Sequence, residues 1–182
     1  MKNLFLLVSF LTAIHASNAQ KMYIWCPQKL TPSPRTTQLK DVSIDLVITD
    51  SRVFTGKVKN KCNSDELKNS LFELIRSTYP SARITLISDK KSISSNTSVL
   101  IEVDITAYHA TFTTPMWFAQ TDFSVKIKNL KATTSTEFSK DIHKEKKFFN
   151  VGGFGTAKNN LNKSYLEASI ELLDFISDSL NN

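Results

Sequence analysis

The sequence predicts an α+β fold: a mostly antiparallel sheet of about five strands, with two amphipathic helices packed on one face. From Val99 to Ala107 every second residue is apolar, and Glu102, Asp104 and Thr106 between them are polar, which is typical of a half-buried strand. A second alternating run at 117–128 follows a link that contains Pro115, and it predicts an antiparallel partner. Helical stretches beginning at Asn63 and Asn160 each carry an apolar stripe that can cover the sheet.

The first 19 residues have the pattern of a secretory signal peptide. Lys2 precedes an apolar block at 4–14, and the small residues Ser17 and Ala19 predict cleavage before Gln20. The block is shorter than the roughly 20 residues that a membrane-spanning helix needs. We therefore expect a periplasmic or secreted protein with no membrane span, whose net charge falls from +6 to +5 when Lys2 is lost.

Residues 20–40 show no sustained periodicity, and three prolines (Pro27, Pro32 and Pro34) interrupt both helices and strands there. We predict an extended N-terminal arm for this stretch and a single α+β domain for residues 41–182. Cys26 and Cys62 are the only cysteines, and an even pair in an exported chain favours a disulfide. Closing a loop of about 35 residues would contribute about 3–4 kcal/mol, mainly by restricting the unfolded chain. Buried free thiols are the alternative.

In the first half of the domain, alternation at 42–49 predicts a strand, with a short continuation at 53–58. Asn63 and Glu66 have the spacing of a capping box, so a helix is expected to begin there and to end before Pro80. A short strand at 83–87 and a polar loop then lead into the central pair.

In the second half, the polar stretch 135–147 predicts a wet edge strand, because lysines discourage pairing with another molecule. The glycines at 152, 153 and 155 precede the last helix, predicted for 160–179. Their spacing matches neither a dinucleotide fingerprint nor a Walker loop, and we interpret them as a chain reversal that uses positive φ.

The sequence shows no recognisable motif of catalytic residues. His109 and His143 have no second ligand at metal spacing, and no nucleophile motif is present. Glu102 and Asp104 share one strand face, which a solvated surface explains equally well. We therefore predict no catalytic residue, no metal and no cofactor.

A contact surface is predicted from charge and from outward-facing apolar residues. The stretch 126–147 holds seven lysines against three acids, and Met116 and Phe118 flank the core-facing Trp117. An envelope protein or an anionic glycolipid would suit such a surface; nucleic acid is not expected. The predicted contact residues are Met116, Phe118, Lys126, Lys128, Lys144 and Lys146.

The chain resembles the YajG-like bacterial envelope lipoproteins over roughly residues 41–181. The resemblance is carried by V-S-I-D-L-V-I-T-D-S-R in the first strand and by F-N-V-G-G-F-G-T-A-K-N-N-L before the terminal helix. Those proteins carry a lipidated cysteine at the mature N-terminus, whereas this chain is predicted to start with Gln20. The family supplies no catalytic residues to carry over.

Together these observations favour an exported, non-enzymatic binding or assembly module of the cell envelope. The alternative is a carrier of a small apolar or lipid ligand, held in a pocket between the sheet and the helices. An enzyme ranks third, because no acid, base or nucleophile set can be assembled from the sequence.

Overall fold

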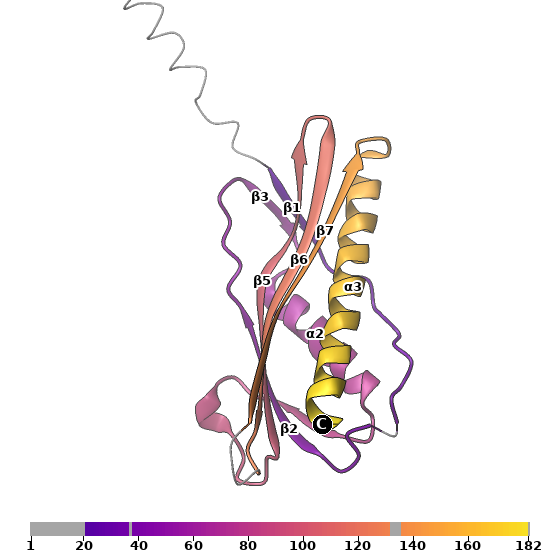
Figure 1. Cartoon of the computed structure of the whole chain (residues 1–182). Coiled ribbons are helices and arrows are strands. Elements are labelled where there is room, and N and C mark those ends of the chain that lie inside the picture. The colour runs from indigo at the N-terminus through magenta and orange to yellow at the C-terminus, as the bar shows by residue number, and fades with distance from the viewer. Residues whose placement is uncertain (1–20, 37, 132–135, 182) are drawn as a thin grey trace, which may run out of the picture.

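The computed structural model describes residues 21–36, 38–131 and 136–181, so the predicted signal peptide and its cleavage site lie outside the described residues. A long twisted sheet is covered on one side by the helices (Figure 1). The elements in chain order are β1 (Met22–Trp25), β2 (Ser43–Asp50), β3 (Val58–Lys61), α2 (Ser64–Thr78), β4 (Arg83–Leu86), the short 3₁₀ helix η1 (Lys90–Ser92), β5 (Val99–Thr113), β6 (Met116–Asn129), β7 (Glu137–Phe149) and α3 (Gly153–Asn181).

The α+β class is confirmed, but the prediction of a mostly antiparallel sheet of about five strands is wrong. The sheet has seven strands and is mixed. β5 lies at its centre and pairs antiparallel with β1 and β6 but parallel with β2. The pairs β1–β3 and β2–β4 are also parallel. The β2–β4 and β2–β5 pairs are parallel because the connection through β3 and α2 carries the chain back before it re-enters the sheet. The β1–β3 pair precedes α2 in the chain and does not depend on this helix.

The central pair β5–β6 has the core face that the alternation predicted. Val103 lies directly opposite Val125, and both side chains are buried in the main core. A bulge at Thr106 then shifts the register, since Ile105 pairs with Phe123 and Ala107 pairs with Asp122. Beyond an extra residue in one strand, the side chains of that strand point to the opposite faces of the sheet.

This exchange overturns the predicted direction of two side chains. Strict alternation puts Ala107 on the core face of β5 and Tyr108 on the polar face. In the structure Tyr108 is fully buried in the core instead. The sequence pattern could not reveal this, because Thr106 suits either an ordinary strand position or a bulge.

The helix α2 begins and ends where the sequence predicted. Asn63 is its N-cap: the Asn63 side chain accepts a hydrogen bond from the Glu66 amide, and the Glu66 carboxylate accepts one from the Asn63 amide, each at 2.8 Å. Tyr79 is the C-cap, directly before Pro80. This reciprocal pairing satisfies two otherwise orphaned amides.

The terminal helix α3 starts at Gly153, seven residues before the predicted start. Gly153 has φ +57°, so the chain reversal does use a positive φ, as interpreted. The glycines obscured the earlier start, yet burial of Ala157 and Leu161 holds the first turns on the sheet. The predicted stripe is confirmed by the near-complete burial of Leu161, Tyr165, Ala168, Leu172 and Ile176.

The N-terminal stretch contains a strand that periodicity did not predict. β1 lies between β3 and β5, and Ile24 is completely buried. The strand expected at 53–58 lies further along the chain, because β3 begins only at Val58, the last residue of the expected range. A four-residue strand is too short for alternation to be detected. Among the helices of the described residues, none has the length and apolar character needed to span a bilayer.

Candidate functional site

The predicted contact residues do not form one surface. Met116 and Phe118 are half-buried on the sheet face away from the helices, with the Lys147 ammonium 5.7 Å from the Phe118 ring centre. Trp117, between them, is buried in the core. Lys126 and Lys128 lie toward the opposite end of β6, more than six residues along the strand.

The two remaining predicted lysines face α3. Lys144 forms an ion pair of 2.5 Å with Glu171, and Lys146 forms one of 2.6 Å with Glu167. Lys140 joins Glu171 from the other side at 2.8 Å. These lysines therefore attach the edge strand β7 to the terminal helix. The sequence could not show this because the partner acids come from a separate element.

One end of the molecule combines several features of a contact site. It contains the turn between β5 and β6 and the link between β7 and α3 (residues 150–152), at the top of Figure 1. We call it the Pro115 end. The Asn150 amide donates to the Pro115 carbonyl oxygen at 3.1 Å, and the Trp117 indole donates to the Asn150 side chain at 2.9 Å. These bonds hold the turn and the link side by side.

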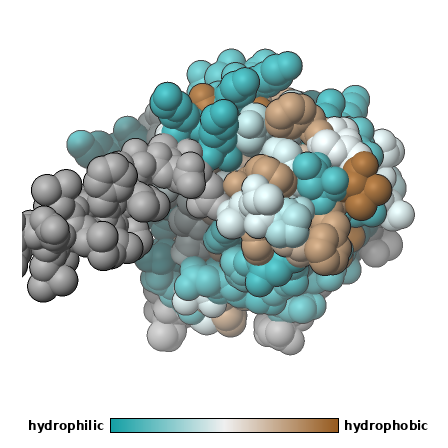
Figure 2. Space-filling model, turned by 90° about the horizontal axis from the view of Figure 1, so that it is seen from above, coloured by the Kyte–Doolittle hydropathy of each residue, from teal (hydrophilic) through white to brown (hydrophobic). Residues whose placement is uncertain are grey.

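Three large apolar side chains are exposed at this end: Phe149 by 66%, Val151 by 91% and Phe154 by 55%. We call these residues the apolar tip. Figure 2 looks down on the Pro115 end and shows brown, hydrophobic side chains among pale ones, bordered by hydrophilic residues. Several large apolar side chains exposed at one end of a molecule indicate a candidate interaction site. In the sequence this segment was interpreted only as a chain reversal.

Aromatic rings support the apolar tip from below. Phe154 packs 5.0 Å from Tyr23 and 5.7 Å from Trp117, between ring centres. Tyr23 in turn stacks on Trp25 at 5.9 Å. Because these rings come from β1, β6 and α3, the tip is fixed by three elements rather than by the loop alone.

A cleft of about 210 Å³ opens beside these rings, lined by Tyr23, Trp25, Lys59, Lys61 and Phe154. Tyr23 lies opposite Lys59 and Trp25 lies opposite Lys61, so β1 supplies the aromatic side chains and β3 the two lysines. The cleft is therefore an aromatic slot with cations along one side.

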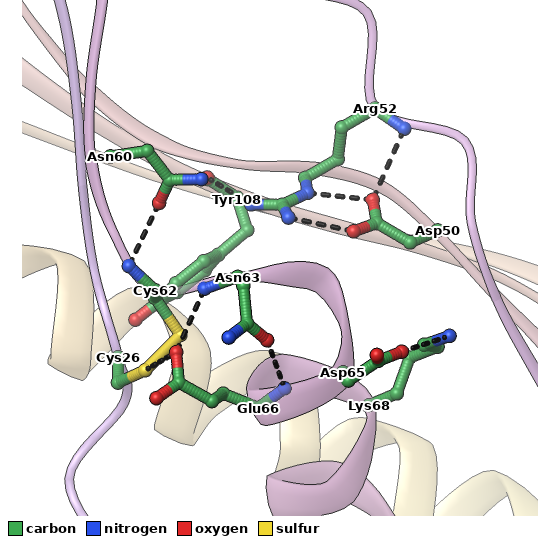
Figure 3. A network of polar contacts seen from close by, with 10 residues as sticks. All are labelled: Cys26, Asp50, Arg52, Asn60, Cys62, Asn63, Asp65, Glu66, Lys68 and Tyr108. Carbon is green, nitrogen blue, oxygen red and sulfur yellow. Dashed lines mark hydrogen bonds and ion pairs between the residues drawn. A yellow bond between two sulfur atoms is a disulfide. The ribbon is translucent and has the colours of Figure 1, made fainter.

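A disulfide between Cys26 and Cys62 links the chain immediately after these two strands (Figure 3). It joins the residues that follow Trp25 and Lys61, which are themselves paired. Within the described part of the chain, Cys26, Cys62 and Glu66 are the one trio of potential metal ligands with donor atoms within 4.8 Å. Both sulfurs are bonded to each other, so they are not available as thiolate ligands.

A buried ion pair lies near the disulfide. Arg52 donates two hydrogen bonds of 2.7 Å to the Asp50 carboxylate, and a longer one of 3.4 Å to the Tyr108 carbonyl oxygen (Figure 3). Burial raises the pKa of Asp50, but hydrogen bonds from Arg52 and Ser64 and the Arg52 charge outweigh it, so the pKa lies below its usual range. Asp50 thus stays ionised and acts as a structural anion.

The paired carboxylates of β5 are engaged in structural contacts. Glu102 forms an ion pair of 2.7 Å with Lys90. Asp104 accepts hydrogen bonds from Thr49 at 2.8 Å and from Ser51 at 2.6 Å. They line a cavity of about 220 Å³ on the open sheet face. Both carboxylates are therefore engaged by cation and hydroxyl partners within the fold.

A second apolar hollow lies between the N-terminal arm and the helices. Its volume is about 390 Å³, and its walls include Leu74 from α2 and Leu173 from α3. Leu166 and Ile170 at its rim are 40% and 47% exposed. Figure 1 shows the arm passing along α3, away from the sheet. This groove therefore differs in place from the predicted pocket between sheet and helices.

The fold and the site define an α+β protein with a mixed seven-stranded sheet and an apolar, aromatic end. No protein-family model and no curated protein matches the sequence. The chain shares its fold with a protein from Helicobacter pylori, provisionally described as a neuraminyllactose-binding hemagglutinin homolog. The TM-score is 0.55 at 11% sequence identity, over 84% of this chain and 92% of that one.

Two further structures have a looser likeness. Hypothetical protein CT253 from Chlamydia trachomatis has a TM-score of 0.48 at 10% identity, over 76% of this chain and 96% of that one. Lipoprotein GNA1162 from Neisseria meningitidis has a TM-score of 0.34 at 7% identity, over 69% of this chain and 99% of that one.

Proposed function

We propose that this protein is an exported, non-enzymatic binding module of the bacterial cell envelope that contacts its partner through the Pro115 end. The exposure of the apolar tip carries the proposal, since Val151 and Phe149 are mostly in solvent. Buried Trp117 and Tyr23 fix the segment that presents them. A rigidly held apolar surface gains free energy when a partner covers it.

An extracytoplasmic location is supported by the Cys26–Cys62 disulfide, because such bonds persist in oxidising compartments. Membership of the YajG-like lipoproteins is part of the proposal and rests on the quoted sequence resemblance. The absence of enzymatic activity is also proposed: Glu102 and Asp104, the carboxylates that share the face of one strand, have structural partners.

The proposal is tested by photo-crosslinking in the envelope fraction of the native cells. A photoreactive residue replaces Val151 in one variant and Leu130 in the other. Leu130 is also apolar and exposed but follows the far end of β6. We expect crosslinks to envelope components from position 151 and not from 130. Equal crosslinking from both positions, or none from 151, would refute a contact at the Pro115 end.

A carrier function is the second candidate, and the groove between the arm and the helices favours it. Its 390 Å³ volume and apolar walls suit part of a lipid or another small apolar molecule. Native mass spectrometry of the gently purified protein should then show added mass. The double substitution Leu166→Asn and Ile170→Asn should remove that mass, whereas Val151→Ser should not.

A further inference from the structure

Positive charge gathers at the Pro115 end. The segments that build this end contain no acidic residue. Those segments meet there because Met22 pairs with both Thr111 and Val58, and Met116 pairs with Phe149. They belong to four stretches of chain: 21–40, 51–64, 105–121 and 146–166. None of these stretches contains an aspartate or a glutamate.

The same stretches are rich in lysine near the apolar tip. Lys57, Lys59 and Lys61 lie on or beside β3, and Lys158 lies in the second turn of α3; all four are exposed. On β7 and α3, the first carboxylates beyond this region are Glu145 and Glu167. Each is paired with a lysine, Lys147 at 3.0 Å and Lys146 at 2.6 Å. The charge near the tip is therefore one-sided.

We propose that the Pro115 end docks on an anionic lipid surface, with the apolar tip entering the headgroup region and the surrounding lysines facing lipid phosphates. This proposal rests on the proposed function and names its partner. Phenylalanine and valine favour the apolar side of a bilayer interface, tryptophan and tyrosine favour its border, and lysines add electrostatic attraction.

A lipid surface fits these features better than a protein partner. Lysine is depleted from protein–protein interfaces, and their cores are extended patches rather than a projecting link. Here Val151 projects at 91% exposure from a short link, and Lys59 and Lys61 line the cleft beside Phe154. An exposed apolar end with lysines beside it matches a planar, deformable and negatively charged surface.

The test is co-sedimentation of the described domain, with its disulfide intact, with lipid vesicles. Vesicles contain phosphatidylcholine alone, phosphatidylcholine with phosphatidylglycerol, or phosphatidylcholine with lipid A. We expect binding only where an anionic lipid is present, and weaker binding at high salt because screening shortens the reach of exposed charges. Binding to both anionic mixtures assigns recognition to charge density, and binding to one identifies the headgroup.

Two variants, each with a matched control, separate the contribution of the lysines to lipid binding from that of the apolar tip. Changing Lys57, Lys59, Lys61 and Lys158 to Gln should weaken binding roughly fivefold for each lysine, which corresponds to about 1 kcal/mol each. The control changes Lys40, Lys91, Lys126 and Lys131 to Gln, with the same change in net charge. Phe149→Ser with Val151→Ser should also reduce binding, and Leu86→Ser with Leu130→Ser is its control.

Absence of binding to both anionic mixtures, or equal loss in a variant and its control, would overturn the lipid proposal. The crosslinking at position 151 is independent of this result. If position 151 crosslinks to an envelope protein while vesicles fail to bind, the binding module stands and its partner is a protein. If both fail, the Pro115 end is not a contact site.

Discussion

The hydroxyl of Tyr108 donates a hydrogen bond to the carbonyl oxygen of Trp25, 2.9 Å away. The bond joins the central strand β5 to β1, the strand next to the aromatic cleft. Burial raises the pKa of Tyr108, so its hydroxyl keeps its proton and remains a donor. This contact exists only because the bulge at Thr106 turns Tyr108 inward.

Replacing Tyr108 with Phe removes this donor and leaves the ring in place. We expect the free energy of unfolding to fall by about 1 kcal/mol, since the Trp25 carbonyl oxygen loses its partner in a partly buried site. Urea unfolding followed by tryptophan fluorescence measures the change. An unchanged midpoint would show that water replaces the hydroxyl without cost.

Deleting Thr106 should be tolerated better than deleting Asp104 from the same strand. Without Thr106, Ile105 and Tyr108 both fall on the core face of a regular strand, opposite their present partners. Without Asp104, a regular strand that keeps Val103 on the core face turns the buried Ile105 outward and Thr106 inward. Comparing soluble yield and unfolding midpoints of the two deletions tests this, and equal loss would contradict it.

Reducing the Cys26–Cys62 disulfide should lower the free energy of unfolding by about 3–4 kcal/mol, given the sequence separation of 36 between the cysteines. The double variant Cys26→Ser and Cys62→Ser should match the reduced protein. Urea unfolding with and without a reductant measures the difference. The free energy of unfolding of the double variant should not change with reductant. This control distinguishes loss of the disulfide from any other effect of the reductant.

Arg52→Leu leaves the buried Asp50 carboxylate without its cation and should cost about 3–5 kcal/mol. Replacing both residues with Leu should be less damaging, because no charge then remains buried. In the wild type the folded-state pKa of Asp50 lies below its ordinary 3.8. Its stabilisation is therefore complete above that value and is lost as the pH falls toward the folded pKa. Unfolding measured across this acid range should show the loss in the wild type and not in the doubly substituted protein.

Acidification should destabilise the fold through His109 at a higher pH than it does through Asp50. Burial lowers the pKa of His109 below its ordinary 6.5; nearby Arg52 acts in the same direction and Asp122 opposes them. The unfolded chain therefore binds a proton first, and stability falls as the pH drops below 6.5. His109→Gln should remove this decline in melting temperature between neutral and mildly acidic pH. His143→Gln, which removes a 60% exposed side chain, serves as the comparison.

Local sequence patterns were sufficient to predict the elements that depend on residues close together in the sequence. The Asn63–Glu66 capping box placed the start of α2, and alternation around Val103 and Val125 placed the core face of the central pair. Both depend on backbone periodicity and short-range hydrogen bonds, which residues a few positions apart determine.

By itself, then, the sequence determined the α+β class, the central hairpin, both helices and the stripe of α3 that covers the sheet. Only the tertiary structure decided the direction of Tyr108, the recruitment of β1 into the sheet, and the pairing of Lys144 and Lys146 with α3. It also brought parts of four acid-free stretches of chain together at the Pro115 end. These features join residues far apart along the chain, and their free energy depends on contacts that no local pattern encodes.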